Sequence, residues 1–224
     1  MRKILGTPKE TNKKLTEIIK KTQINNFYLK NKKDFRDQIL SQILESDDVL
    51  DIGRSMRDKY SKINSNLLET LDVNEYDNYP DIICDVCDNI TSLENKYDKI
   101  ICIALLEHVY DPFKAVNNLK KMLKENGVLY GFVPYLYQYH APPDLKFQDY
   151  FRFSKDSLSY LFKDYKSLEI YPLRGRISAP LHILFGIKWK KYFEKTKINF
   201  FLDKFISDEK NSIQCSGYNF IAKK

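Results

Sequence analysis

Short apolar runs alternate with longer polar or amphipathic segments along most of this chain. Between positions 49 and 133 the runs predict five strands, at 49–52, 69–73, 81–85, 98–104 and 127–133. Strands of this length, separated by helical or loop segments, are typical of a parallel sheet with helices on both faces. Two later runs, at 167–173 and 213–222, predict the last strands of the same sheet.

The clearest helix is predicted at 111–124. Pro112 stands in its first turn, apolar residues follow on one face, and Asn126-Gly127 ends it. The segments 9–22 and 34–44 also place apolar residues at helical spacing, so we expect N-terminal helices that pack on the sheet. The first segment is basic, and a basic amphipathic helix can instead lie on a membrane surface.

The run Val49-Leu50-Asp51-Ile52-Gly53 is the stretch around which the other segments are arranged. An apolar strand ending in Asp-x-Gly brings a loop and a helix N-terminus to a ligand at the carboxyl edge of an α/β sheet. Asp72 ends the next apolar segment, about 20 residues later, the offset at which a second acid contacts a ribose hydroxyl. Asp85 ends the third segment, and Glu107-His108 follow the fourth. We expect a ligand site where these strand ends meet.

Residues 49–162, about half of the chain, resemble a class I S-adenosylmethionine-dependent methyltransferase. The resemblance is carried, in the family's order, by the segments 49–53, 71–73, 85–86, 106–112, 119–134 and 140–154. Their order is more specific than any one segment. The chain is most similar to the branch associated with bacterial surface glycans and other small-metabolite pathways, so polysaccharide biosynthesis is the expected setting.

The resemblance implies a Rossmann-like α/β fold with a seven-stranded sheet, mostly parallel with an antiparallel last strand, and helices on both faces. Residues 1–46 are expected to form N-terminal helices that cover the cofactor site. Residues 47–224 are expected to form the methyltransferase core, with a substrate-side loop at 135–153 and an inserted segment at 174–208. That insertion could cap the substrate, form a dimer face or contact a membrane.

S-adenosylmethionine is the cofactor that the resemblance implies. The residues expected to bind it are Asp51, Gly53, Ser55, Asp72, Asp85 and Glu107. The family normally follows Asp-x-Gly with a small residue and a second glycine, because a side chain there would crowd the cofactor. Here the loop reads Gly53-Arg54-Ser55-Met56-Arg57, in which Ser55 is small.

Methyl transfer from a sulfonium is an in-line displacement, so a hydroxyl acceptor also needs a base at the sheet's carboxyl edge. His140 is a candidate base, with Asp144 and Asp149 nearby to orient it. The alternative is that His140 only fixes its loop by hydrogen bonds. His108 is the second catalytic candidate, although the pair Glu107-His108 can also support the loop around the methionine end of the cofactor.

The acceptor is expected under the loop that follows the fifth strand. The residues expected to bind it are Tyr137, Asp144, Tyr150 and Arg152. An arginine can grip a phosphate or carboxylate through two parallel hydrogen bonds. Arg152 could instead pair with Asp144 or Asp149 and shape the loop.

Composition narrows the class of protein. With 224 residues and 43% hydrophobic content, the chain is long enough for one large domain with a well-formed core. No apolar run approaches the roughly 20 residues of a membrane span, and a charged stretch follows residues 1–5, so we expect a cytoplasmic protein. The four cysteines lie in apolar segments. Cys84-x-x-Cys87 suggests a metal site, but without a second ligand pair we favour reduced, buried thiols and expect no metal.

The net charge of +7 comes mainly from lysines that are spread along the chain and alternate with acids. This pattern favours a solvated surface over a DNA-binding face, and it would attract an anionic small-molecule acceptor. The leading hypothesis is O- or N-methylation of a glycan or nucleotide-linked sugar, with a homodimer possible. The alternatives are an inactive methyltransferase-like binding or assembly subunit, suggested by the altered glycine loop, and an RNA methyltransferase, suggested by the basic pI.

Overall fold

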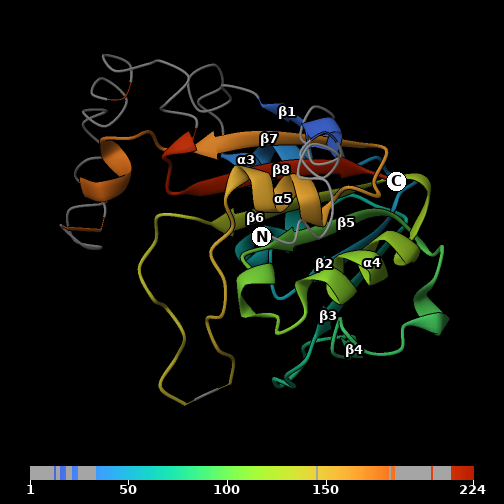
Figure 1. Ribbon diagram of the computed structural model, residues 1–224. Helices are drawn as coiled ribbons and strands as arrows, with labels where there is room; N and C mark the ends of the chain where they lie inside the picture. The colour runs from blue at the N-terminus through green and yellow to red at the C-terminus, as the bar shows by residue number, and fades with distance from the viewer. Residues whose placement is uncertain are drawn as a thin grey trace, which may run out of the picture.

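The computed structural model describes residues 13, 16–18, 22–24, 34–144, 146–181, 183–184, 203 and 213–224. A single eight-stranded sheet runs through this part of the chain, in the order β1-β7-β8-β6-β5-β2-β3-β4 (Figure 1). The strands are β1 (Thr22–Ile24), β2 (Asp48–Ile52), β3 (Leu67–Asp72), β4 (Ile82–Ile83), β5 (Tyr97–Ile103), β6 (Leu123–Pro134), β7 (Ser167–Leu173) and β8 (Gly217–Lys223). The α-helices are α3 (Phe35–Leu40), α4 (Pro112–Met122) and α5 (Lys155–Leu161), and three 3₁₀ turns are η1 (Arg57–Lys62), η2 (Thr91–Leu93) and η3 (Leu106–His108).

The direction of strand addition reverses next to β2. From β2 the chain adds β3 and then β4 on one side, and it returns to place β5 and then β6 on the other side. All four of these pairings are parallel, with β2 hydrogen-bonded to both β3 and β5. A reversal of this kind opens a crevice at the carboxyl ends of the strands, which is where open α/β sheets bind ligands.

The sheet ends as the sequence predicted. β8 lies between β6 and β7 and is antiparallel to both, while the remaining strand pairs are parallel. The predicted fold class is therefore confirmed. The sheet has eight strands rather than the predicted seven because residues 22–24 form an edge strand parallel to β7. The helix predicted at 9–22 was therefore drawn one residue too far, since Thr22 belongs to this strand. Residues 13 and 16–18 of that predicted helix are helical, and its other positions before Thr22 lie outside the described residues.

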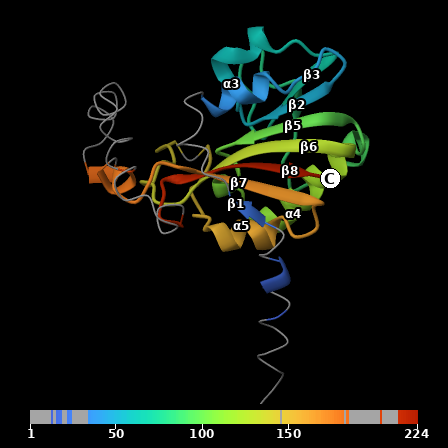
Figure 2. The same ribbon diagram turned by 90° about the horizontal axis from the view of Figure 1, so that it is seen from above.

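Helices cover both faces of the sheet, and the strand β5 shows why. Ile100 and Cys102 of β5 belong to the apolar cluster under α4 and α5, whereas Ile101 and Ile103 belong to the cluster under α3. Successive side chains of a strand point to opposite faces, so a continuous apolar run is buried on both sides. Figure 2 shows α3 on one side of the sheet and α4 and α5 on the other.

The helix α4 has the start that the sequence indicates. The Asp111 carboxylate accepts a hydrogen bond from the backbone N–H of Lys114 at 3.0 Å, and Pro112 occupies the first turn. The helix ends at Met122 rather than at the predicted position 124, and β6 begins at the next residue. Most of the insertion predicted at 174–208, including His182, lies outside the described residues. In the described part of the chain no helix is long and apolar enough to span a membrane.

The close pairing of β6 and β8 yields a prediction for stability. Gly131 of β6 lies opposite Phe220 of β8, and a Cβ atom added at Gly131 would lie 2.1 Å from Cζ of the buried Phe220 ring. We expect Gly131→Ala to lower the free energy of unfolding by about 1–3 kcal/mol, the usual cost of overpacking a core. Urea denaturation measures this change. In the double variant with Phe220→Leu the two losses should be less than additive, because the smaller side chain removes the clash; full additivity would contradict the packing argument.

Candidate functional site

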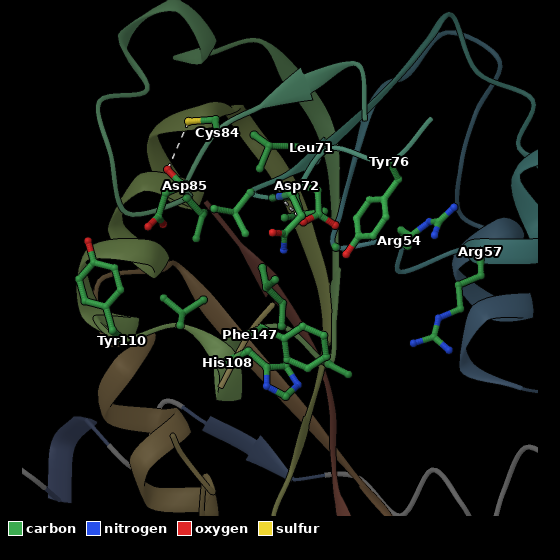
Figure 3. Close-up of a pocket in the computed structure, with 18 of the residues that line it drawn as sticks. Arg54, Arg57, Leu71, Asp72, Tyr76, Cys84, Asp85, His108, Tyr110 and Phe147 are labelled. Atoms are coloured by element: carbon green, nitrogen blue, oxygen red, sulfur yellow. Dashed lines mark hydrogen bonds between the residues drawn. The ribbon is translucent and has the colours of Figure 1, made fainter. Parts of the chain in front are cut away.

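One cavity of about 710 Å³ lies at the carboxyl ends of β2, β3, β4 and β5 (Figure 3). Its wall includes Gly53 after β2, Asp72 at the end of β3, Asp85 after β4 and Leu105 after β5. These are the strand ends that the sequence predicted would meet. The volume falls in the range of about 300–1,000 Å³ that small-molecule sites occupy.

The turn after β2 is fixed by glycine and serine. Gly53 has φ 66°, and a Cβ atom at this position would lie 3.0 Å from the side chain of Leu105, which also lines the cavity. The Ser55 hydroxyl donates to the Ile52 carbonyl at 2.6 Å and accepts from the Ile103 N–H at 2.7 Å. Ser55 is therefore buried, joins β2 to β5 and does not line the cavity, and its contact with the cofactor stays a prediction.

Arg54, the main departure from the family's glycine pattern, turns its side chain away from the glycine. Its guanidinium lies over the ring of Tyr79 at 4.7 Å and over that of Tyr76 at 5.2 Å, in cation–π geometry. Its backbone N–H donates to the Tyr79 hydroxyl at 2.8 Å. The side chain therefore lies toward one end of the cavity with Arg57 and Tyr76, as Figure 3 shows.

Asp51 lies beneath the same turn and is fully buried. Its Oδ2 accepts hydrogen bonds from the Met56 N–H at 3.3 Å and from the Tyr60 hydroxyl, while Oδ1 has no hydrogen-bond partner within the described segments. Burial raises the pKa of this carboxyl to about 7. Asp51 does not line the cavity, so it orders the turn from below.

The two other acids predicted to hold the cofactor both line the cavity. Asp72 accepts from the Asn74 N–H at 3.1 Å, and Asp85 accepts from the Cys87 N–H at 2.8 Å. Each of these bonds occupies only one carboxylate oxygen. Because a carboxylate can accept several hydrogen bonds, both acids have oxygens that could accept from a ligand in the cavity.

The two cysteines of the Cys84-x-x-Cys87 pair are held by different carbonyl groups. Cys84 donates to the Asp85 carbonyl, and Cys87 donates to the Asp111 carbonyl, so the two thiols point to different partners. Burial raises the pKa of both thiols, and all four cysteines are free. Buried, protonated thiols are weak metal ligands.

Two histidines face the cavity from different segments. His108 ends η3, which follows β5, and His140 comes from the loop after β6; their rings meet edge to face with centroids 4.7 Å apart. The Glu107 carboxylate lies behind them, fully buried, with Oε1 3.7 Å from Nε2 of each ring. Glu107 does not line the cavity. This carboxylate and then that of Asp149, 3.1 Å from the His140 ring, raise the pKa of His140.

The loop at 135–153 is organised by one ion pair. Arg152 donates to both carboxylate oxygens of Asp149, at 2.6 Å for the Nη2 contact, and also to the Gln138 carbonyl at 2.9 Å. The guanidinium lowers the pKa of Asp149 to about 2, so this carboxylate is ionised. Arg152 therefore shapes the loop, which is one of the two roles considered from the sequence.

The residues predicted to bind the acceptor stand apart from the cavity wall. Tyr137 packs its ring on that of His140, with centroids 5.4 Å apart. Asp144 is exposed and pairs with Lys146, and the exposed Tyr150 donates to Gln148. None of these, nor Arg152, lines the cavity, and their binding role stays a prediction.

Several cavity residues were missed by the sequence reasoning. They are Arg57, Tyr60, Asn74, Tyr76, Tyr110 and Phe147. The aromatic members lie in turns and loops that follow strands. Tyr110 lies within the segment 106–112, which the sequence analysis had placed after the fourth strand at the ligand edge of the sheet. The packing of the Phe147 ring on His108, at a centroid distance of 4.5 Å, depends on a loop whose path no pattern indicated.

Comparison with known proteins agrees with this geometry. Residues 54–131 match a family described as a methyltransferase domain. The fold is similar to that of an S-adenosylmethionine-dependent methyltransferase from Archaeoglobus fulgidus, with 16% identity, a TM-score of 0.53, and coverage of 84% of this chain and 94% of that one. It is also similar to phosphoethanolamine N-methyltransferase 2 from Haemonchus contortus in complex with S-adenosyl-L-methionine, with 14% identity, a TM-score of 0.52 and 84% coverage of this chain.

The matched proteins differ in the share of their length that this chain covers. The chain spans about half (51%) of the Haemonchus contortus enzyme, and no curated protein matches it. The cyclase SpnF shares the fold as well, with 13% identity, a TM-score of 0.50, and coverage of 84% of this chain and 80% of that one. Residues 54–131 thus match a methyltransferase domain, and the solved structures share the fold of this chain.

The buried Asp51 yields a prediction about pH. Its pKa of about 7 exceeds the usual 3.8, so the folded protein binds this proton more tightly than the unfolded chain does. The resulting stability is complete below about pH 4 and is lost as the pH rises to about 7, at a cost of at most about 4 kcal/mol. Asp51→Asn should therefore be more stable than the natural protein at pH 8, and the gap in free energy of unfolding should narrow toward pH 4. A gap that is independent of pH would show that Asp51 is ionised throughout.

Proposed function

We propose that this protein transfers a methyl group from S-adenosylmethionine to an oxygen or nitrogen atom of a small molecule. The observation that carries the proposal is the cavity at the strand ends, which brings the Gly53 turn and two acids together with two histidines. The first group suits a nucleoside cofactor, and the second suits removal of a proton from an acceptor. The matched methyltransferase domain supports the same reaction.

The cofactor would lie across the strand ends. Asp72 would accept from the ribose hydroxyls and Asp85 from the adenine amine, with the apolar Val86 beside the adenine. The methionine part would lie by Gly53, which has no side chain of its own to crowd it. Arg57, at the same end of the cavity as Arg54, offers a guanidinium for the carboxylate of the cofactor.

The acceptor would lie on the histidine side of the cavity, beside Phe147. Its proton would leave toward the cluster of His108 and His140, while the protein aligns the acceptor atom with the methyl group for in-line displacement. The Asp149 carboxylate holds Nδ1 of His140, so its Nε2 is the nitrogen available for a proton. Asp149 is in turn held by Arg152.

A glycan or nucleotide-linked sugar is the finer proposal for the acceptor. It rests on the sequence resemblance, and it is supported by the excess of positive charge and by the guanidinium groups at the cavity, which would attract a phosphate. Polysaccharide biosynthesis, a cytoplasmic location and a homodimer remain predictions of the same kind.

A second candidate is a binding or assembly subunit without turnover. The specific observation in its favour is Arg54, which stands where the family has a small residue and adopts φ 55°, a left-handed conformation that costs energy for a side chain other than glycine. Binding of the cofactor separates the two candidates, because only the first requires it.

Calorimetric titration with S-adenosylmethionine, and separately with S-adenosylhomocysteine, tests the proposal. We expect a dissociation constant in the micromolar range, equivalent to about −8 kcal/mol. Asp72→Ala should weaken binding about 10- to 100-fold, because it removes a charge-assisted hydrogen bond to the ribose. Asp77→Ala is the matched control: this exposed carboxylate does not line the cavity, so its removal should leave affinity unchanged.

The outcomes separate the candidates cleanly. Absence of heat with either ligand, together with an unshifted melting temperature, would reject the enzyme and favour the binding subunit. Equal weakening by Asp72→Ala and Asp77→Ala would indicate a long-range charge effect and would remove Asp72 from the ribose. With binding established, candidate sugars can be screened for turnover.

A further inference from the structure

Glu107, His108 and His140 bring three potential metal-ligand atoms together around a buried carboxylate, an arrangement that proton transfer alone does not explain. One donor atom from each residue lies within 4.8 Å of the others. The Glu107 side chain is 0% exposed, and neither of its oxygens has a hydrogen-bond partner among the residues that the structure describes. A buried carboxylate without such partners is costly, so the cluster is built to hold a positive charge.

The outer nitrogen of each ring is already engaged. Nδ1 of His108 lies 2.6 Å from the Gln148 carbonyl oxygen, which can only accept, so this nitrogen carries the proton. Nδ1 of His140 lies 3.1 Å from a carboxylate oxygen of Asp149, which also accepts. In the neutral rings both Nε2 atoms therefore present lone pairs toward Glu107.

The distances fit a cation better than a direct hydrogen bond. Each Nε2 is 3.7 Å from Oε1 of Glu107, beyond the roughly 2.7–3.2 Å of an N–H to oxygen bond. Ligand atoms bonded to zinc at about 2.0–2.2 Å stand about 3.0–3.5 Å from one another in tetrahedral or octahedral arrangements. The two distances to Glu107 would need to shorten by a few tenths of an ångström for one ion to bind, and all three donor atoms lie within 4.8 Å of one another.

We propose that Glu107, His108 and His140 bind a transition-metal dication such as Zn²⁺. Two imidazole nitrogens and one carboxylate oxygen form a ligand set of the kind found in catalytic zinc sites, which leave a further position open. Both histidines line the cavity, so that open position faces the acceptor. The cysteines take no part in the site.

The surroundings orient the two rings as metal ligands require. The Asp149 carboxylate on Nδ1 of His140 fixes the tautomer that leaves Nε2 free, and the ion pair with Arg152 fixes Asp149 itself. The aromatic edges of Phe147 and Tyr137 pack on His108 and His140 respectively. Asp149 is thus a positioning residue for the site.

The chemical role of the proposed cation depends on the proposed methyltransferase function. The acceptor's hydroxyl would bind at the open position of the metal ion. A bound metal ion would lower the pKa of that hydroxyl and so prepare the acceptor for methylation at neutral pH. In that form His140 is a ligand, and the acceptor's proton leaves to solvent. Binding of the metal is measured independently of methyl transfer, so the two proposals can fail separately.

The test begins with purified protein freed of metal by a chelator and then titrated with Zn²⁺. We expect one ion per chain, bound at least tenfold more weakly by Glu107→Gln and by His140→Ala. Glu125→Gln is the matched control: this exposed carboxylate lies at the amino end of β6, away from the cavity, and its loss should leave Zn²⁺ affinity unchanged. Cys84→Ser should also leave it unchanged, and the Co²⁺ derivative should lack a thiolate charge-transfer band.

Binding of S-adenosylhomocysteine by each variant serves as the check on folding and on the cofactor site. Where Glu107→Gln does not fold, His140→Ala carries the test. The cation site would be overturned if the protein binds the cofactor but no stoichiometric Zn²⁺, or if both variants keep the same Zn²⁺ affinity. The positive charge that the cluster holds would then be a proton. Stoichiometric Zn²⁺ that both variants weaken, in protein that binds no cofactor, would support the site and reject the methyltransferase.

Discussion

The hydroxyl of Ser55 holds the turn after β2 against the end of β5, and the ligand-facing segments are placed relative to that turn. It donates to β2 and accepts from β5, so the two strands at the switch point cannot separate without breaking a buried hydrogen bond. Arg36 of α3 adds a hydrogen bond to the Ser55 carbonyl at 2.7 Å. The turn can therefore keep two successive left-handed residues, Gly53 and Arg54, although only the first favours that conformation.

Two fully buried carboxylates lie close to the cavity without lining it. Asp51 beneath the turn has one oxygen without a hydrogen bond, and Glu107 behind the histidines has two. Sequences usually break the rule that buried polar groups are paired only where function requires it. Asp51 still has Tyr60 and Met56 as hydrogen-bond partners, whereas Oε1 of Glu107 has two imidazole nitrogens at 3.7 Å, beyond hydrogen-bond distance. This difference is why Glu107 indicates a charged ligand and Asp51 does not.

The sequence predicted the parts of the fold that depend on local patterns. Apolar runs located the strands, and the acid that ends each run placed Asp72 and Asp85 in the cavity, because parallel strands end at one edge. The helix α4 was recognised from Pro112 and its apolar face. The strand β1 was not, because a three-residue edge strand carries no periodicity and its pairing with β7 joins segments that are far apart in the chain.

The site was harder to predict than the fold because it depends on loops. Ser55 was assigned to the cofactor by its small size, but its hydroxyl is used within the turn. His140 and His108 were noted separately, and nothing in their spacing showed that the loop after β6 folds back to place His140 beside His108 and Glu107. Arg152 pairs with Asp149, one of the two roles that the sequence left open, and only the path of the loop shows that pairing. Loop paths of this kind follow from contacts that no repeat in the sequence encodes.

The shape of the cavity bears on the acceptor. A volume of about 710 Å³ suits a cofactor together with a small acceptor, whereas a folded RNA would have to extrude a single base to reach the histidines. Such a base would be read by hydrogen bonds and by stacking on aromatic rings, and positive charge would line its path. Two arginines do lie at the cavity, but they stand at the Gly53 end, beside the expected position of the methionine carboxylate and away from the histidines. The positive charge therefore serves the cofactor or an anionic tail on a small acceptor better than it serves a nucleic-acid backbone.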